Sequence, residues 1–153
     1  MISSGSDLDL VLIGNDGPNR HEVEAIIDSR KLGARVQLLH DRPNQEVWWW
    51  MRHAECFVLP SREEPFGIVL LEAAKSRIPV VATRVGGIPE FLTDREDGLL
   101  CDPDNADQLF DALMLTLADR EASSRRVESF YAKAAELSWE GAFDAYRRSA
   151  QLP

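Results

Sequence analysis

The sequence predicts an α/β protein with a doubly wound parallel sheet, and three observations support this. Short apolar segments that are typical of strands alternate with longer amphipathic segments that are typical of helices. The strand segments are almost continuously apolar, as expected for parallel strands that helices cover on both faces. The chain has 153 residues, which suffices for one domain with a sizeable core.

Five apolar segments are predicted to be strands. Each is short, rich in Val, Leu or Ile, and bounded by Gly, Pro, Asn or Asp. The first ends at the turn Gly14-Asn15-Asp16-Gly17-Pro18. The predicted strands are Leu8 to Ile13, Arg35 to Leu39, Glu55 to Leu59, Pro79 to Thr83 and Leu99 to Cys101.

Helices are predicted between these strands and after the last one. In the first helix Val23, Ile26 and Ile27 recur at helical spacing, and Gly33 is the stop signal. Beyond Asn105 the pattern is helical only. The predicted helices are Asn19 to Leu32, Asn44 to Ala54, Gly67 to Arg77, Ile88 to Leu92, Ala106 to Ala118, Arg120 to Glu136 and Trp139 to Ala150.

Two helices carry aromatic residues that deserve separate interpretation. Val47, Trp50, Met51 and Ala54 share one helical face that is interpreted as core, whereas Trp48 and Trp49 point elsewhere and suit a contact with another domain or copy. In the final helix an apolar stripe is predicted to dock on the domain itself, or else to pair with another copy or stay mobile. Its members are Trp139, Phe143 and Tyr146.

Composition excludes several classes of protein. Hydrophobic residues make up 44% and charged residues 28% of the chain, as in a soluble globular protein. No apolar run approaches the ~20 residues of a membrane span, and the first residues lack the features of a signal peptide. A net charge of −9 argues against a general nucleic-acid binder. Cys56 and Cys101 both lie in apolar strand-like runs, which suits free thiols in a reducing, cytoplasmic setting.

The segment from Pro60 to Ala73 carries the clearest chemical signal. Glu64 and Glu72 bracket a Phe-Gly turn and an apolar run, directly after a predicted strand. Carboxyl ends of parallel strands are where open α/β sheets bind ligands. The amides of Phe66, Gly67 and Ile68 would open the next helix and suit a phosphate. A phosphate site with a hydroxyl acceptor on each side indicates a nucleotide-sugar.

The alternatives for the two carboxylates are structural. Glu64 could simply lie in a solvated turn with Arg62 and Glu63. Glu72 sits in an otherwise apolar stretch, where an unpaired buried carboxylate is costly, so a salt bridge to Lys75 or Arg77 is the alternative to binding ribose hydroxyls.

The stretch Glu64-Pro65-Phe66-Gly67-Ile68-Val69-Leu70-Leu71-Glu72 resembles the E-x7-E signature of the retaining glycosyltransferases of the glycosyltransferase-4 (group 1) family. The resemblance extends from about Asp9 to Asp104 and more loosely to the C-terminus. Its other elements are Phe57-Val58-Leu59-Pro60-Ser61, Pro79-Val80-Val81-Ala82-Thr83, Val85-Gly86-Gly87-Ile88-Pro89-Glu90 and Gly98-Leu99-Leu100.

The resemblance implies the Rossmann-like donor-binding domain of a GT-B enzyme over residues 8–153, with residues 1–7 as a linker or appended residues. In that family a strand and helix before the first strand seen here carry an Arg and a Lys that hold the diphosphate. The chain is therefore interpreted as an excised C-terminal domain without the acceptor-binding domain. We expect it to be inactive alone, and this segment does not indicate an association with membranes. The resemblance assigns the catalytic role to Glu64 and a donor-binding role to Glu72. It also places further residues in the donor site. They are Phe66, Gly67, Ile68, Ser61, Gly14, His40, Gly86, Gly87 and Glu90.

The remaining candidates have plainer explanations beside the functional one. Gly14 and the pair Gly86-Gly87 follow strands, where a simple turn is the alternative to a close approach of backbone to donor. His40 lies just past the second strand, where the resembled family wraps backbone around the nucleobase. No His, Cys, Asp or Glu spacing indicates a metal site, and no metal or other cofactor is expected.

Two other functions remain open at this point. A nucleotide-sugar epimerase of the same fold would share the scaffold, and the spacing of Glu64 and Glu72 favours the transferase. A non-catalytic α/β interaction module would have lost the pocket residues. The presence of both glutamates and the glycines argues against this alternative. For the transferase that the resemblance implies, a UDP- or GDP-hexose is the expected donor for transfer to an acceptor hydroxyl.

Overall fold

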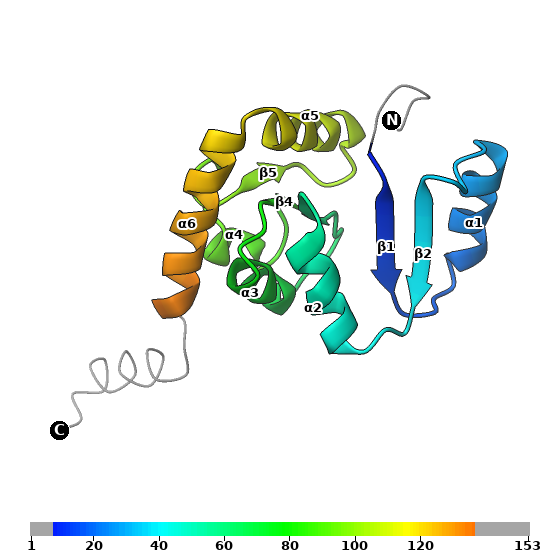
Figure 1. Cartoon of the computed structure of the whole chain (residues 1–153), viewed down its shortest axis with the longest axis horizontal. Helices are drawn as coiled ribbons and strands as arrows, with labels where there is room; N and C mark the ends of the chain where they lie inside the picture. Colours follow the sequence, from blue (N-terminus) through cyan, green and yellow to red (C-terminus); the bar gives the residue numbers. More distant parts are fainter. Residues whose placement is uncertain (1–7, 137–153) are drawn as a thin grey trace. The chain divides into compact units, whose positions relative to one another are not determined.

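The computed structural model describes residues 8–136, which form two compact units divided between Trp49 and Trp50. The expected helix at Trp139 to Ala150, with its aromatic stripe, lies outside the described residues. Each unit contains a parallel sheet with helices against it (Figure 1), so the predicted α/β class is confirmed. The first unit contains a two-stranded parallel sheet and the second a three-stranded parallel sheet.

The first unit holds β1 (Leu10–Gly14), α1 (Arg20–Ser29) and β2 (Val36–His40), and then the start of α2 (Asn44–His53). The two strands pair in parallel from Leu10 opposite Val36 to Gly14 opposite His40. Arg35 ties the start of this sheet, because its guanidinium donates to the Leu8 carbonyl at 2.6 Å.

The second unit contains the remaining strands and helices, and its strand order is β3-β4-β5, all parallel. Its elements are β3 (Phe57–Leu59), α3 (Ile68–Lys75), β4 (Val80–Thr83), α4 (Ile88–Phe91), β5 (Leu99–Cys101), α5 (Ala106–Ala118) and α6 (Arg120–Glu136). Two helices begin at capping residues: the Asn105 side chain accepts from the Gln108 amide at 3.0 Å, and Asp119 accepts from the Ala122 amide at 2.9 Å.

The core of the second unit is built on both faces of β4. Val80 and Ala82 face a cluster formed with α3, α4 and α6, whose largest member is the fully buried Phe130. Because side chains alternate along a strand, Val81 points to the opposite face, where α5 lies against β4 and β5 (Figure 1). All four β4 residues are buried for this reason.

The outer edge of β5 is closed by a side chain. The Leu100 amide donates to an Asp94 carboxylate oxygen at 2.9 Å, and Asp94 also forms an ion pair with Arg84 at 3.1 Å. An edge amide that is already bonded cannot template another strand. Within the second unit, β3 pairs in parallel with β4.

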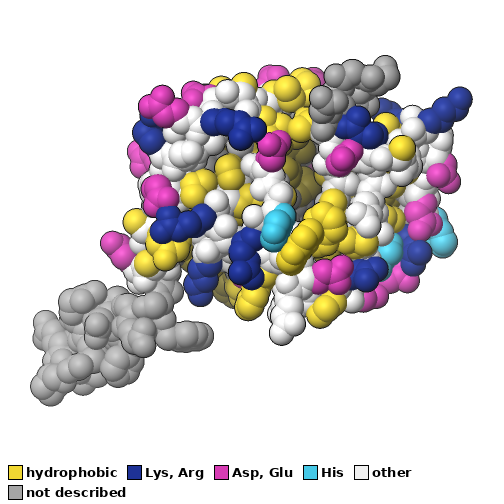
Figure 2. Space-filling view, viewed as in Figure 1, with side chains coloured by type: hydrophobic (Ala, Val, Ile, Leu, Met, Phe, Trp, Pro, Cys, Tyr) yellow, Lys and Arg dark blue, Asp and Glu magenta, His cyan; other side chains and the backbone are white. Residues whose placement is uncertain are grey.

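The surface carries mixed charges without a basic stripe on the visible face. Figure 2 shows acidic and basic side chains interspersed over α5 and α6. Cys56 and Cys101 are both free thiols, as predicted. Burial raises the pKa of the Cys56 thiol to about 12. Within the described part of the chain, no helix is long and apolar enough to cross a membrane.

Trp48 and Trp49 on α2 are both exposed, as predicted, and Met51 is buried. Trp50 is half-buried, whereas Ala54 is exposed, so the predicted core face of this helix ends before Ala54. Ala54 lies just beyond the last helical residue, His53.

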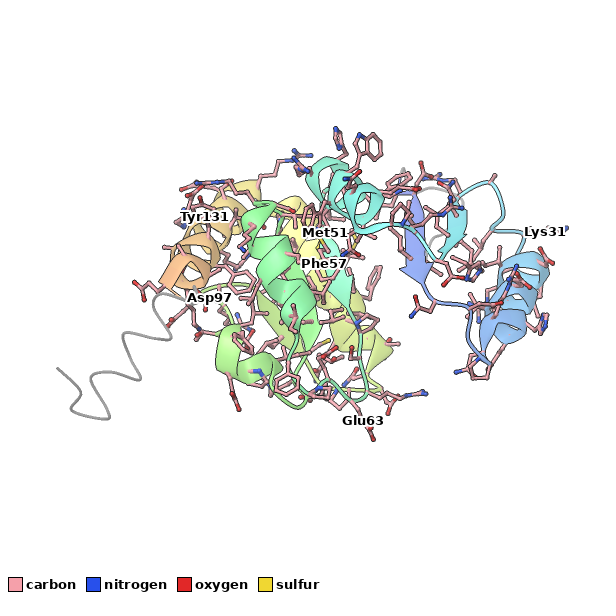
Figure 3. The ribbon with its side chains drawn as sticks, turned by 90° about the horizontal axis from the view of Figure 1, so that it is seen from below. Lys31, Met51, Phe57, Glu63, Asp97 and Tyr131 are labelled. Atoms are coloured by element: carbon pink, nitrogen blue, oxygen red, sulfur yellow. The ribbon has the colours of Figure 1, made fainter. Side chains whose placement is uncertain are left out.

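A buried carboxylate joins the loop before β5 to α6. Asp97 is 5% exposed and accepts hydrogen bonds from Lys133 Nζ, the Thr93 amide and Ser129 Oγ at 2.9, 2.9 and 2.8 Å. Figure 3 shows Asp97 beside this helix. Burial by itself raises the pKa of Asp97, but the three bonds outweigh it and lower the pKa below its ordinary value.

We expect Asp97→Asn to lower the free energy of unfolding at pH 7 by about 1.5–3 kcal/mol, because it removes a charge-assisted bond to Lys133. A carboxylate whose pKa is lowered by folding stabilises the fold above its unfolded pKa of about 4, and that contribution is lost as the pH falls through the folded value. Urea denaturation of both proteins at pH 7 and pH 3 measures the difference.

The matched control is Glu121→Gln, which removes the exposed partner of Arg125 and should change the free energy of unfolding by less than about 1 kcal/mol. An Asp97→Asn effect as large at pH 3 as at pH 7 would contradict the role of the charge.

Candidate functional site

The candidate site is built on the loop from Pro60 to Gly67, which joins the carboxyl end of β3 to α3. Proline at position 60 has no amide hydrogen, so it cannot continue the ladder with β4. The ladder accordingly ends at Leu59 opposite Ala82. The chain then leaves the sheet at the edge where parallel sheets bind ligands.

Glu64 turns its carboxylate back toward the helix start. One carboxylate oxygen accepts the Gly67 amide at 3.0 Å. Gly67 precedes the helix in the left-handed conformation, with φ of 63°, and glycine has no side chain with which to cap the helix. Glu64 therefore accepts the amide of the residue just before the helix, and its neighbour Glu63 projects away from the loop (Figure 3).

This contact changes the predicted use of the helix amides. The sequence analysis assigned the amides of Phe66, Gly67 and Ile68 to a phosphate, but in this structure the Gly67 amide is bonded to Glu64. The side chains of Phe66 and Ile68 are 68% and 66% exposed. The start of α3 thus presents two apolar side chains beside an acidic group.

Glu72 is half-buried on α3, one turn after Ile68 and on the same face of the helix. Neither a hydrogen bond nor an ion pair joins its side chain to another residue in the stretch 8–136. The alternative salt bridge to Arg77 is wrong, because Arg77 pairs with Glu128 of α6 and its guanidinium carbon lies 3.9 Å from the centre of the Tyr131 ring. Arg77, two residues after the last residue of α3, has a left-handed backbone conformation with φ of 54°.

The loop after β4 packs its backbone directly on the Glu64 loop. Gly87 donates its amide to the Glu64 carbonyl at 3.0 Å. A Cβ at Gly86, whose φ is 51°, would lie 2.1 Å from that same carbonyl oxygen, and one at Gly87 would lie 2.5 Å from the Pro65 carbonyl oxygen. Both glycines are therefore required by the contact with residues 64 and 65.

Two further bonds hold this loop, and the sequence analysis missed both. The buried Thr83 hydroxyl donates to the Ser61 carbonyl at 2.6 Å. Arg62 and Asp104, which follow β3 and β5, form an exposed ion pair at 2.7 Å. The available signal for Thr83 was a polar residue that ends an otherwise apolar strand.

The other predicted site residues lie as follows. Glu90 is exposed in the first turn of the short helix α4. Gly14 and His40 face each other at the ends of β1 and β2 in the first unit. His40 lines two hollows of about 310 and 290 Å³ beside α1, and its ring nitrogens are buried without a hydrogen-bond partner among residues 8–136. In that same part of the chain, no group of three His, Cys, Asp or Glu side chains could hold a metal ion.

Comparison with known proteins connects this geometry to a family. The family model for glycosyl transferases of group 1 matches residues 2–133. The D-inositol 3-phosphate glycosyltransferase of Corynebacterium glutamicum (strain R) is 36% identical over 132 residues, which are 82% of this chain and 31% of that protein. The chain spans about a third of the length of the curated relatives it matches.

Two solved structures have folds similar to that of this chain. Sucrose-phosphate synthase from Thermosynechococcus elongatus matches with a TM-score of 0.81 and 29% identity, over 94% of this chain and 38% of that one. The fold of Anabaena Alr3699/HepE, solved in complex with UDP-glucose, matches with a TM-score of 0.80 and 23% identity, over 93% of this chain and 41% of that one.

We expect Gly86→Ala to lower the free energy of unfolding by about 2–4 kcal/mol, since the new Cβ meets the Glu64 carbonyl and the backbone conformation disfavours a side chain. Gly33→Ala is the control, because no atom lies within 4 Å of its Cβ position, and it should change stability by about 1 kcal/mol or less. Urea denaturation of the two variants tests this, and equal effects would contradict the close approach.

Proposed function

Because this chain belongs to the glycosyl transferases of group 1, we propose that it is the donor-binding part of a retaining glycosyltransferase. The donor is a nucleotide-sugar, a UDP- or GDP-hexose, whose hexose passes to an acceptor hydroxyl. One observation carries the proposal: Glu72 is a half-buried carboxylate without a partner in the described chain, on the helix that begins directly after Gly67, whose amide donates to Glu64.

Glu72 binds the ribose in this proposal. A carboxylate in a largely apolar helix loses hydration unless something donates to it. Leu70, Ala73 and Ala74 around it are almost completely buried. The 2′- and 3′-hydroxyls of a ribose supply two donors, and a carboxylate can accept both.

Glu64 holds the transferred hexose. Its carboxylate has two oxygens and about four acceptor positions, of which the Gly67 amide uses one. The remaining positions accept hydrogen bonds from sugar hydroxyls. UDP-glucose, the ligand in the HepE complex, is the first donor to test.

Reaction at the anomeric carbon places positive charge on the sugar ring and negative charge on the leaving diphosphate. We propose a front-face mechanism in which the leaving phosphate takes the proton of the acceptor hydroxyl, so the anomeric configuration is retained. Backbone amides at the start of α3 other than that of Gly67, which donates to Glu64, stabilise the departing phosphate. Glu64 positions the sugar and is not a nucleophile, and no metal takes part.

The longer protein supplies what transfer requires besides the donor residues. In this proposal a preceding segment holds the diphosphate with basic side chains, and a separate domain binds the acceptor. The reaction is placed in the cytoplasm, where two free thiols remain reduced.

We expect this 153-residue chain to bind UDP or GDP weakly, about ten- to several-hundred-fold more weakly than the full-length protein. The reason is that one or two charge-assisted hydrogen bonds of about 1.5–3 kcal/mol each are missing. Calorimetry with UDP, UDP-glucose, GDP and GDP-mannose at millimolar concentration measures this.

Substitutions of the two glutamates should have different effects on affinity in the same titrations. Glu72→Gln should weaken the plain nucleotide and the nucleotide-sugar equally, whereas Glu64→Gln should weaken chiefly the nucleotide-sugar. Glu63→Gln is the matched control, since that exposed side chain points away from the loop. A folded wild-type chain that binds none of the four compounds would overturn the proposed function.

We expect the chain alone to transfer no sugar, because transfer needs the acceptor held about 3–3.5 Å from the anomeric carbon with water excluded. A radiolabelled donor assay with a panel of alcohol acceptors, compared with the rate of donor hydrolysis, measures this. Acceptor-dependent turnover above hydrolysis would show that the acceptor site lies within this chain.

A further inference from the structure

We propose that Thr83, the last residue of β4, is a positioning residue that sets Glu64 for the donor sugar. The inference rests on the proposed function, since Glu64 is the residue assigned to the sugar. It adds a residue that does not touch the donor and acts through the Pro60–Gly67 loop.

Thr83 extends the contact between β3 and β4 beyond the last ladder pair, Leu59 opposite Ala82. The residue after Leu59 is Pro60, which has no amide to donate. The Thr83 hydroxyl instead donates to the Ser61 carbonyl at 2.6 Å. Thr83 is 4% exposed, so water cannot easily replace it.

Besides the exposed Arg62–Asp104 ion pair, two more hydrogen bonds fix the loop downstream of Ser61. The Gly87 amide donates to the Glu64 carbonyl, and the Glu64 carboxylate accepts the Gly67 amide, both at 3.0 Å. The first two of these three attachments come from β4 and the turn that follows it, and the third comes from the start of α3. Glu64 therefore bonds both to the turn after β4, through its carbonyl, and to the start of α3, through its carboxylate.

Loss of the Thr83 hydroxyl leaves the Ser61 carbonyl without its donor at the beginning of the loop. The residues between Ser61 and Glu64 then have one attachment fewer, and the carboxylate shifts relative to the helix. Displacements of about 1 Å at a binding group are known to cost about 100-fold in activity. Glu72 should be unaffected, because α3 is held independently by buried Leu70 and Ala73.

The test is calorimetry on the 153-residue chain with UDP and UDP-glucose, and with GDP and GDP-mannose, using whichever pair the wild type binds more tightly. Thr83→Val keeps the shape of the side chain and removes the hydroxyl. It should weaken the nucleotide-sugar about tenfold and the plain nucleotide less than about threefold. Thr83→Ser retains the hydroxyl and should bind like the wild type.

A thermodynamic cycle shows whether Thr83 acts through Glu64. The double variant Thr83→Val with Glu64→Gln should bind the nucleotide-sugar as Glu64→Gln alone does, whereas independent effects would add. If Thr83→Val does not fold, as judged by circular dichroism, Thr83→Ala takes its place with the same expected losses.

The outcomes separate the two proposals. Equal weakening of nucleotide and nucleotide-sugar, full additivity in the cycle, or no loss in a folded variant would overturn the positioning role and leave the proposed function intact. A wild-type chain that binds none of the four compounds would overturn both.

Discussion

The approach of two glycines to the backbone of Glu64 and Pro65 is the constraint on which the candidate site depends. At Gly86 the Glu64 carbonyl oxygen occupies the place where a Cβ would lie, and at Gly87 the Pro65 carbonyl does the same. Any side chain there would separate the loops after β3 and β4. Since the Gly87 amide also bonds Glu64, the position of that residue follows from a contact that only glycine permits.

The Glu64 carboxylate links this contact to the hydrophobic core. The Gly67 amide, just before α3, donates to the Glu64 carboxylate at 3.0 Å. The helix that follows is anchored by Leu70 and Ala73, both without exposed surface, in the cluster that also holds Phe130 of α6. A charged group at the sheet edge is thereby held by a rigid helix on one side and by a packed turn on the other, which is how a binding group acquires a fixed geometry.

Local chemistry explains why some elements were predicted closely. The starts of α5 and α6 agree with the prediction because Asn105 and Asp119 are capping residues with a clear sequence signal. The strands were found because they are short and apolar. The strand order within each unit, β1-β2 and β3-β4-β5, could not be read in the same way, since an apolar pattern identifies a strand without saying which edge pairs with which.

The sequence by itself determined the order of strands and helices, and it placed Glu64, Glu72, Gly86 and Gly87 in a family motif, because these features depend on residue type and spacing. The tertiary structure alone decided that Glu64 caps Gly67, that Thr83 bonds Ser61 and that Arg77 turns to Glu128 instead of Glu72. These partners are 3, 22 and 51 residues apart along the chain. Even the nearest pair depends on a left-handed backbone at Gly67, so each contact exists only after the chain has folded.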